Sequence, residues 1–359
     1  MITSKILTIN PNPEETKIAI FKSTKLIFLK TIKHNPKDLS QFKNFCEQVD
    51  FRTNLILKEL EENEIKINQI EIIVARGGLV KPLKSGVYAV NKKMIEDLKN
   101  SPIGQHASNL GGLIADDIAK HIPGAKAYIA DPVVVDELDE VARISGHPLF
   151  ERKSIFHALN QKSVARKFAK SINKKYEELR LIVAHIESGI SVGAHKNGRV
   201  IDVNQTLDGE GPFSFERTGT LPVGDLLRMC SSRKYSKDEI NEMITTKGGL
   251  FAYLGVRNLT ELEAMVDNGS EKANFISFAM AYQLAKEIGS MYTVLEGDVD
   301  GIIFSGEIFH WKKFANYVSD RVDKIAPIAI YPNEDEMEAL AMNGLMLLKG
   351  EVEVMKYEG

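Results

Sequence analysis

Cysteine is scarce in this chain of 359 residues. Its only two cysteines, Cys46 and Cys230, are far apart and have neither CxxC nor metal-ligand spacing. This spacing excludes a disulfide framework and is typical of proteins from a reducing compartment. We expect both thiols to be buried in apolar surroundings.

Long apolar runs and an excess of one charge are also lacking. No run approaches the roughly 18 apolar residues that span a bilayer, and segment 1–9 lacks the apolar core of a signal peptide. We therefore expect a cytoplasmic protein without a membrane partner. A formal net charge of −3 gives no electrostatic reason to bind nucleic acid. We expect a small-molecule ligand instead.

The length and the strand pattern indicate two similar α/β domains. A chain of 359 residues exceeds the size at which a single core keeps growing. Two apolar strands around an Asn/Pro turn predict a hairpin at 6–21, and a second hairpin at 181–195 leads through Asn197-Gly198 into strand 200–203. A hairpin that opens each half indicates a duplicated fold. No low-complexity linker occurs, so the boundary should be a packed hinge near 145–180.

The periodicity of apolar residues predicts the other elements. Buried strands are expected at 70–74, 127–129, 301–304 and 328–331. Helices are expected at 107–121, 221–230, 239–245, 271–295, 314–325 and 334–348, and 39–60 has mixed helical spacing.

Segment 131–166 combines acidic, basic and apolar side chains. Pro132 cannot continue a central strand, so Asp131 should lie at a strand end, where active-site groups of open sheets usually lie. An acidic helix-like run is expected from Asp136. A second helix should open at Lys153–His157.

Several blocks resemble the acetate and butyrate kinases of the acetate/sugar kinase, Hsp70 and actin superfamily, and specifically the butyrate kinase branch. The blocks are ARGGLVKPLKSGVYAV from Ala75, QHASNLGG from Gln105, segment 131–166, and DGEGPFSFERTGTLP from Asp208. The resemblance implies two duplicated RNase H-like (actin-like ATPase) domains around a central cleft. It further implies phosphoryl transfer between ATP and butyrate or a short branched fatty acid.

The domains expected from this resemblance are 1–150 with a returning helix at 333–359, on the acyl substrate side, and 151–332, on the nucleotide side. The relatives also imply a homo-oligomer, a dimer or larger.

The resemblance implies the site residues position by position. The catalytic residues would be Arg76, Asp131, His157 and Arg217. The substrate would contact Gly78, His106 and Phe156, and ATP or ADP would contact Asn10, Lys17, His185, Gly189 and Gly306. Asn10 and Glu336 would hold Mg²⁺. Taken singly, each residue has a structural explanation in a loop, a turn or a helix cap, and only their joint order favours the functional one.

General chemistry agrees with these roles. Phosphoryl transfer needs positive charge around the equatorial oxygens, which planar arginines supply. A carboxylate acceptor is already ionised at neutral pH, so we expect Asp131 to orient metal-bound water or the substrate and not to act as a base. Gly78 stands where acetate kinases resemble each other in having valine, which should leave room for extra methylenes beside Phe156.

The expected nucleotide loops depart from the family's small-residue pattern. The first reads Pro11 to Thr16 and includes Glu14 and Glu15, the second contains Glu187, and the third contains Glu307. A carboxylate about 5 Å from a phosphate charge costs roughly 3 kcal/mol at an effective dielectric of about 20. Two hypotheses stay open: an active carboxylate kinase, or a nucleotide-impaired paralogue with a binding or regulatory role.

Overall fold

The chain forms two compact units in the computed structural model, which describes residues 4–333 and 335–359. The first unit comprises Met1–Val135 and Asp335–Gly359, and the second comprises Asp136–Glu334. Segment 136–150 therefore groups with the second unit. The returning carboxy-terminal segment groups with the first.

A seven-stranded mixed sheet organises the first unit, in the order β12-β5-β6-β4-β1-β2-β3. The strands are β1 (Lys5–Pro11), β2 (Glu15–Lys22), β3 (Lys25–Lys33), β4 (Ile70–Arg76), β5 (Val87–Ala89), β6 (Lys126–Ala130) and β12 (Val354–Lys356). β1, β2 and β3 form an antiparallel meander, whereas β1, β4 and β6 are parallel neighbours. The predicted first hairpin is confirmed.

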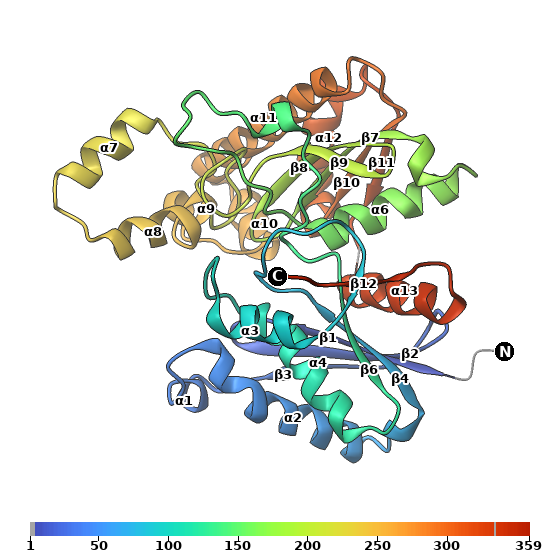
Figure 1. Cartoon of the computed structure of the whole chain (residues 1–359). Helices are drawn as coiled ribbons and strands as arrows, with labels where there is room; N and C mark the ends of the chain where they lie inside the picture. Colours follow the sequence, from blue (N-terminus) through green and yellow to red (C-terminus); the bar gives the residue numbers. More distant parts are fainter. Residues whose placement is uncertain (1–3, 334) are drawn as a thin grey trace. The chain divides into compact units, whose positions relative to one another are not determined.

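Helices cover both faces of this sheet (Figure 1). The central strands carry apolar residues on both of their faces, so both faces must be covered. Leu7 and Ile73 point to the face covered by α4 (Asn109–His121) and α2 (Val49–Glu62). The opposite face is covered by α13 (Glu336–Lys349), where Gly344 brings its backbone close to Ile6 and Val74. The shorter helices of this unit are α1 (Pro36–Leu39), η1 (Phe45–Gln48), η2 (Ile67–Gln69) and α3 (Lys92–Asn100).

A five-stranded sheet organises the second unit, in the order β11-β10-β7-β8-β9. Its strands are β7 (Arg180–Ile186), β8 (Ile190–Lys196), β9 (Arg199–Val203), β10 (Gly301–Ser305) and β11 (Ile328–Tyr331). β7, β8 and β9 form an antiparallel meander, and β10 and β11 run parallel to β7. This order repeats β3-β2-β1-β4-β6 of the first unit, so the predicted duplication is confirmed.

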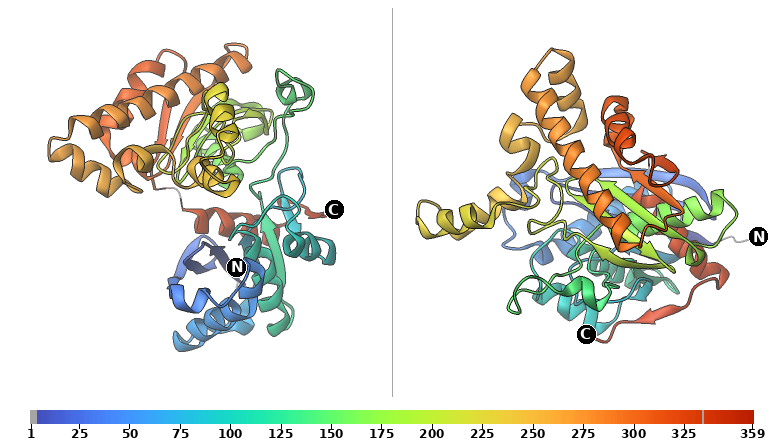
Figure 2. Two further views of the ribbon diagram at one scale, coloured as in Figure 1. Left: turned by 90° about the vertical axis from the view of Figure 1, so that its left-hand side faces the viewer. Right: turned by 90° about the horizontal axis from the view of Figure 1, so that it is seen from above.

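The second sheet is also covered on both faces. α6 (Ala158–Ser171) packs through Val164 and Phe168 on one face. α11 (Glu271–Val294) and α12 (Lys312–Val322) pack on the other face. The remaining helices are α5 (Glu140–Arg143), η3 (Tyr176–Glu178), α7 (Val223–Ser231), α8 (Lys237–Thr245), α9 (Gly249–Leu254), α10 (Leu259–Asp267) and η4 (Glu307–His310). Figure 2 shows α7 projecting from the body of its unit.

Three sequence-based expectations were wrong. The acidic run from Asp136 is mostly irregular, with only the single turn α5, because the Asp136 carboxylate accepts two hydrogen bonds from Arg143, each 2.7 Å long. Lys153–His157 precedes α6 and is not part of it. Cys230 is exposed on α7 and Cys46 is half-buried, so neither thiol is fully enclosed.

Within the described part of the chain, no helix is long and apolar enough to cross a membrane.

Candidate functional site

The carboxyl ends of three parallel strands bring polar residues together in the first unit. Asn10 is near the end of β1, Arg76 ends β4, and Asp131 directly follows β6. The register pairs Arg76 with Ala130, so Asp131 begins one residue beyond the paired strands. Parallel strands end at the same edge of a sheet, which is the usual place for ligands in open α/β sheets.

Helix α13 adds a carboxylate to this edge. Asp335 caps the helix by accepting a hydrogen bond of 2.8 Å from the Met337 amide, and Glu336 is its first residue. Glu336 accepts a hydrogen bond from Asn10 Nδ2 and lies 3.1 Å from Arg76 Nη1. The positive end of the helix dipole and Arg76 together stabilise the ionised carboxylate. We call Asn10, Arg76, Asp131 and Glu336 the first-unit group.

Asp131 is held in an unusual backbone conformation. Its φ of 37° lies in the left-handed region, which costs a non-glycine residue on the order of 1 kcal/mol or more. The side chain offsets part of this cost, since Oδ1 accepts hydrogen bonds from Ser85 Oγ (2.6 Å) and the Gly86 amide (2.8 Å). The carboxylate is 2% exposed and has one fixed orientation.

The oxygen of Asn10 is the part of this group best suited to a metal. Asn10 Oδ1 is buried and has no hydrogen-bond partner among the described residues. It belongs to the same side chain that donates to Glu336. Amide and carboxylate oxygens are the ligands that Mg²⁺ prefers in proteins, so this donor set fits the ion.

The lysine expected near the nucleotide lies close by. Lys17 pairs with Asn10 across the β1–β2 hairpin, and its Nζ lies 3.6 Å from Asp335 Oδ1. The ion pair connects β2 to the residue that caps α13.

Gly78 has a packing role that contradicts the expected spare volume. A Cβ at Gly78 would lie 2.6 Å from Asn109 Cα and 2.7 Å from Asn109 Oδ1. The same Oδ1 accepts a hydrogen bond of 2.8 Å from the Leu79 amide. The glycine therefore allows close approach to the start of α4, and Asn109 fills the space that was expected for substrate methylenes.

His106 stabilises the start of the same helix. Its Nδ1 accepts a hydrogen bond from the Ser108 amide at 3.2 Å and lies 2.8 Å from Ser108 Oγ. This confirms the structural explanation for His106 and leaves a ligand contact through its other ring nitrogen as a prediction.

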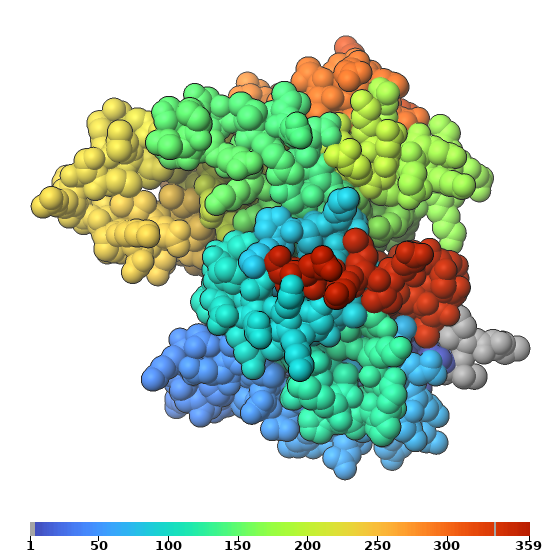
Figure 3. Space-filling model, in the orientation of Figure 1, coloured from blue at the N-terminus to red at the C-terminus, as the bar shows by residue number. Residues whose placement is uncertain are grey.

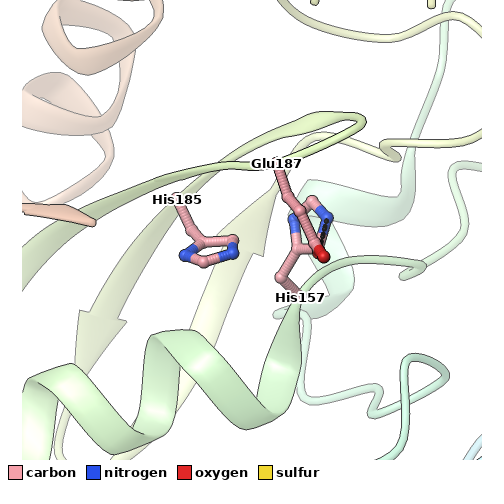
Figure 4. Close-up of side chains that lie close together, drawn as sticks. All are labelled: His157, His185 and Glu187. Atoms are coloured by element: carbon pink, nitrogen blue, oxygen red, sulfur yellow. Dashed lines mark ion pairs between the residues drawn. The ribbon is translucent and has the colours of Figure 1, made fainter. Parts of the chain in front are cut away.

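In the second unit, two histidines and a glutamate lie close together (Figure 4). His157 directly precedes α6, His185 is on β7, and Glu187 is in the β7–β8 turn. The two imidazole rings are 4.8 Å apart between centroids, and Glu187 Oε2 lies 3.8 Å from His157 Nε2. Both rings are buried, whereas the Glu187 side chain is 47% exposed.

These three side chains could offer ligand atoms to a metal, all within 4.8 Å of one another. Both ring nitrogens of His185 already make hydrogen bonds, Nδ1 with Ser305 Oγ (3.0 Å) and Nε2 with Asn160 Nδ2 (2.9 Å). A metal would have to replace one of these bonds. The arrangement is therefore held by hydrogen bonds and is not a preformed metal geometry.

Arg217 lies across the same turn. Its Nη1 donates to Thr206 O (3.0 Å) and its Nη2 to Ser188 Oγ (3.2 Å). A Cβ at Gly189 would collide with the guanidinium, so this glycine makes room for the arginine. Two residues of the turn thus make contacts: Glu187 lies near His157, and Ser188 accepts a hydrogen bond from Arg217. We call His157, His185, Glu187 and Arg217 the second-unit group.

Gly306 completes this edge of the second sheet. It follows β10 with φ of 116°, and a Cβ there would collide with Ile186 O. The register places Ser305 beside His185, so the loops after β7 and β10 are neighbours. Glu307, the acid expected in the third loop, is exposed.

Sequence reasoning missed the residues that orient these groups. Ser85, Asn160, Ser191 and Ser305 contact Asp131, His185 or His157 directly. Their only sequence signal is a polar residue within or beside an apolar strand or helix start. Phe156, which precedes His157, is 1% exposed; its contact with substrate stays a prediction.

Comparison with known proteins agrees with this architecture. A model of the acetokinase family matches residues 147–331. Butyrate kinase 2 and butyrate kinase 1 of Clostridium acetobutylicum are 51% and 52% identical to the chain, and each alignment covers 99% of both proteins.

Solved structures show the same fold at low sequence identity. Acetate kinase of Porphyromonas gingivalis superposes with a TM-score of 0.77 at 18% identity, over 96% of this chain and 100% of that protein. Acetate kinase of Entamoeba histolytica gives 0.75 at 16% identity with the same coverage. These structures support the two RNase H-like sheets. Since the family model matches half of the chain and two relatives align over nearly all of it, the chain belongs to the acetokinase family.

Proposed function

We propose that the chain transfers a phosphoryl group between ATP and the carboxylate of butyrate or a short branched fatty acid. In the direction of ATP formation, the bond between phosphorus and the carboxylate oxygen of butyryl phosphate breaks. A new bond forms to the terminal phosphate oxygen of ADP, and butyrate leaves. The observation that carries this proposal is the identity of 51–52% over 99% of the chain to two butyrate kinases.

The first-unit group is proposed to bind the acyl substrate and the metal. Arg76 would neutralise charge on the transferring phosphoryl group, and Asp131 would orient the substrate or metal-bound water. Asn10 and Glu336 would hold Mg²⁺, which supplies further positive charge to the phosphates. The orphaned Asn10 Oδ1 beside the Glu336 carboxylate supports the metal assignment.

The second-unit group is proposed to bind phosphate and nucleotide. His157 and Arg217 would contact the transferring phosphoryl group. His185, Gly189 and Gly306 would lie against the nucleotide, and the close packing at both glycines supports a tight backbone surface there.

Several further contacts belong to the same proposal. Lys17 would add positive charge on the nucleotide side, and Gly78, His106 and Phe156 would border the acyl chain. Since Asn109 fills the space beside Gly78, selectivity for four carbons would have to come from other apolar side chains.

A coupled assay with ADP, Mg²⁺ and butyryl phosphate tests the activity. We expect ATP formation well above background for folded protein. Activity at background would contradict the proposal.

The alternative of a nucleotide-impaired paralogue is not favoured, because near-full-length identity to two butyrate kinases supports a working enzyme. Calorimetric titration with Mg-ATP separates the two hypotheses. We expect binding in the micromolar range, whereas folded protein that releases no heat would support the impaired paralogue.

We further propose that the chain forms a homo-oligomer. α7 buries none of its residues and exposes Val223 (76%), Leu227 (65%) and Met229 (38%). Figure 3 shows this yellow segment standing out from the surface of its unit. Val223 and Leu227 lie one turn apart on the same side of α7, and exposed apolar side chains that lie together are typical of association surfaces. Light scattering should give a mass above the 40.0 kDa of one chain, and Leu227→Asp should lower it; a monomeric wild-type protein would contradict this.

A further inference from the structure

A chain of buried polar side chains leads to His157 within the second unit. Tyr176 Oη lies 2.7 Å from His195 Nδ1, and His195 Nε2 lies 2.9 Å from Gln161 Oε1. Gln161 Nε2 lies 2.8 Å from Ser191 Oγ, which is 2.9 Å from His157 Nδ1. All five side chains are buried, and the three central residues are fully enclosed. Water therefore does not compete for these hydrogen bonds.

The backbone carbonyl of Ser191 determines which groups donate and which accept along this series of hydrogen bonds. It lies 3.1 Å from Gln161 Nε2, and since a carbonyl can only accept, the amide nitrogen of Gln161 must be on this side. Gln161 Oε1 then faces His195, so His195 Nε2 must carry a hydrogen. Burial, followed by the charges of Lys162 and Arg166, holds the pKa of His195 well below its usual range. The ring is neutral, and its Nδ1 accepts from the Tyr176 hydroxyl.

The same logic determines the state of His157 at the other end. Ser191 Oγ accepts from Gln161 and could also accept from His157, but its own buried hydrogen would then have no acceptor, since His157 Nδ1 is the acceptor that the described residues offer to it. The Nδ1 atom of a neutral His157 therefore accepts, and its Nε2 carries the hydrogen. Nε2 is also the nitrogen 3.8 Å from Glu187, so the N–H points to the β7–β8 turn.

We propose that Gln161 and Ser191 are positioning residues that hold His157 in the tautomer with hydrogen on Nε2. The inference rests on the proposed contact between His157 and the phosphoryl group. A neutral imidazole in this tautomer presents a donor to a phosphoryl oxygen, whereas the other tautomer would present a lone pair and repel it.

Strand β8 is shaped to accommodate this chain. A Cβ at Gly193 would lie 2.5 Å from Gln161 Oε1 and 3.3 Å from His195 Nε2. A side chain there would separate the two groups. Gly193 therefore leaves room for the hydrogen bond between Gln161 and His195.

The substitution Gln161→Glu should exchange donors and acceptors in the hydrogen bonds of Ser191. A carboxylate cannot donate to Ser191, so the serine hydroxyl would donate to it, and Ser191 Oγ would then accept from His157 Nδ1. Lys162 and Arg166 lie near enough to act on His195 and would compensate the added charge.

The measurement is ¹⁵N NMR of protein labelled on histidine, with the His157 signals assigned by their loss in His157→Gln. We expect wild type to show hydrogen on Nε2 and Gln161→Glu to show it on Nδ1, with turnover lowered at least about tenfold, equivalent to about 1.4 kcal/mol. Tyr176→Phe keeps the ring over Lys162 and leaves the Ser191 carbonyl in place. It should keep the wild-type tautomer of His157 and serves as the matched control.

An unchanged tautomer in folded Gln161→Glu overturns the inference. A changed tautomer with wild-type turnover supports the positioning chain and contradicts the proposed phosphoryl contact of His157. If Gln161→Glu does not fold, Ser191→Ala replaces it: the His157 Nδ1 resonance should move as its hydrogen bond is lost, and an unmoved resonance overturns the inference.

Discussion

At the scale of single residues, the side chain of Arg217 is held in a fixed position by its neighbours. Two hydrogen bonds from its guanidinium end on Thr206 and Ser188, and Gly189 leaves the space that the group occupies. An arginine held in this way loses little side-chain freedom when it meets a phosphoryl group. Its contribution should therefore appear in the rate more than in substrate binding.

Replacing Arg217 with Ala should lower kcat by about a thousandfold, an effect typical of one lost charge-stabilising group. The KM for butyrate should change only modestly, because the arginine acts on charge that develops in the transition state. Steady-state kinetics measure both constants. Arg321→Ala, on the exposed surface of α12, is the matched control and should keep wild-type kinetics. A rise in KM with unchanged kcat would contradict the assignment.

The acid in the β7–β8 turn should weaken nucleotide binding. Glu187 lies 3.8 Å from His157, but its side chain is 47% exposed, so solvent screens much of its charge. We expect Glu187→Gln to lower the Kd for Mg-ATP about fivefold, or about 1 kcal/mol. Calorimetry measures the change, with exposed Asp320→Asn on α12 as a control for net charge. Weaker binding by Glu187→Gln would instead indicate that the carboxylate is a ligand.

At the scale of elements, a buried arginine holds the β1–β2 turn. Arg52 of α2 is 0% exposed. Its guanidinium donates to the carbonyls of Asn12 (2.8 Å), Pro13 (2.9 Å) and Glu15 (3.0 Å). Gln48 accepts from the same group. The β1–β2 turn thus directs three of its carbonyls to a buried cation.

Replacing Arg52 with Lys should destabilise the protein by about 3 kcal/mol. A lysine cannot reproduce the planar fork, so several buried carbonyls would lose their donor. Urea unfolding measures the loss, and Lys58→Ala on the exposed side of α2 should cost under about 0.5 kcal/mol. A stability equal to wild type would show that the turn does not depend on the fork.

At the scale of the whole molecule, each unit contains a histidine that burial keeps neutral. Burial and then Arg52 lower the pKa of His34 to about 4, and burial with nearby cations lowers that of His195 well below its usual value. The unfolded chain binds these protons near pH 6.5, whereas the folded protein does not. Folded stability is therefore fully present above about pH 6.5 and falls as the pH is lowered towards 4.

We expect the free energy of unfolding to fall by at least about 2 kcal/mol between pH 7 and pH 4.5, from these two histidines together. Urea titrations at a series of pH values measure the decrease. His34→Gln should make the profile shallower, whereas Asn54→Gln on the exposed side of α2, which removes no titratable group, should not change it. Identical slopes in wild type and His34→Gln would contradict the role of His34.

The sequence by itself determined the duplicated α/β fold, because apolar runs of strand length and turn residues are local signals that tertiary contacts did not override. It also determined that Asp131 lies at a strand end, since Pro132 cannot continue the ladder. The family blocks contain Arg76, Asp131, His157 and Arg217, whose catalytic roles stay predictions. The sequence did not predict β3, which exposes much of its apolar surface, or β5 and β12, which are only three residues long each.

Only the tertiary structure decided how the charged residues are oriented. The contact of Glu336 with Asn10 and Arg76 joins the end of the chain to β1 and β4, and the chain from Tyr176 to His157 joins α6 to β8. Such contacts depend on the packing of segments far apart in sequence, which no local pattern encodes. For the same reason, the space beside Gly78 proved to be filled by Asn109, although the glycine alone suggested that it was open.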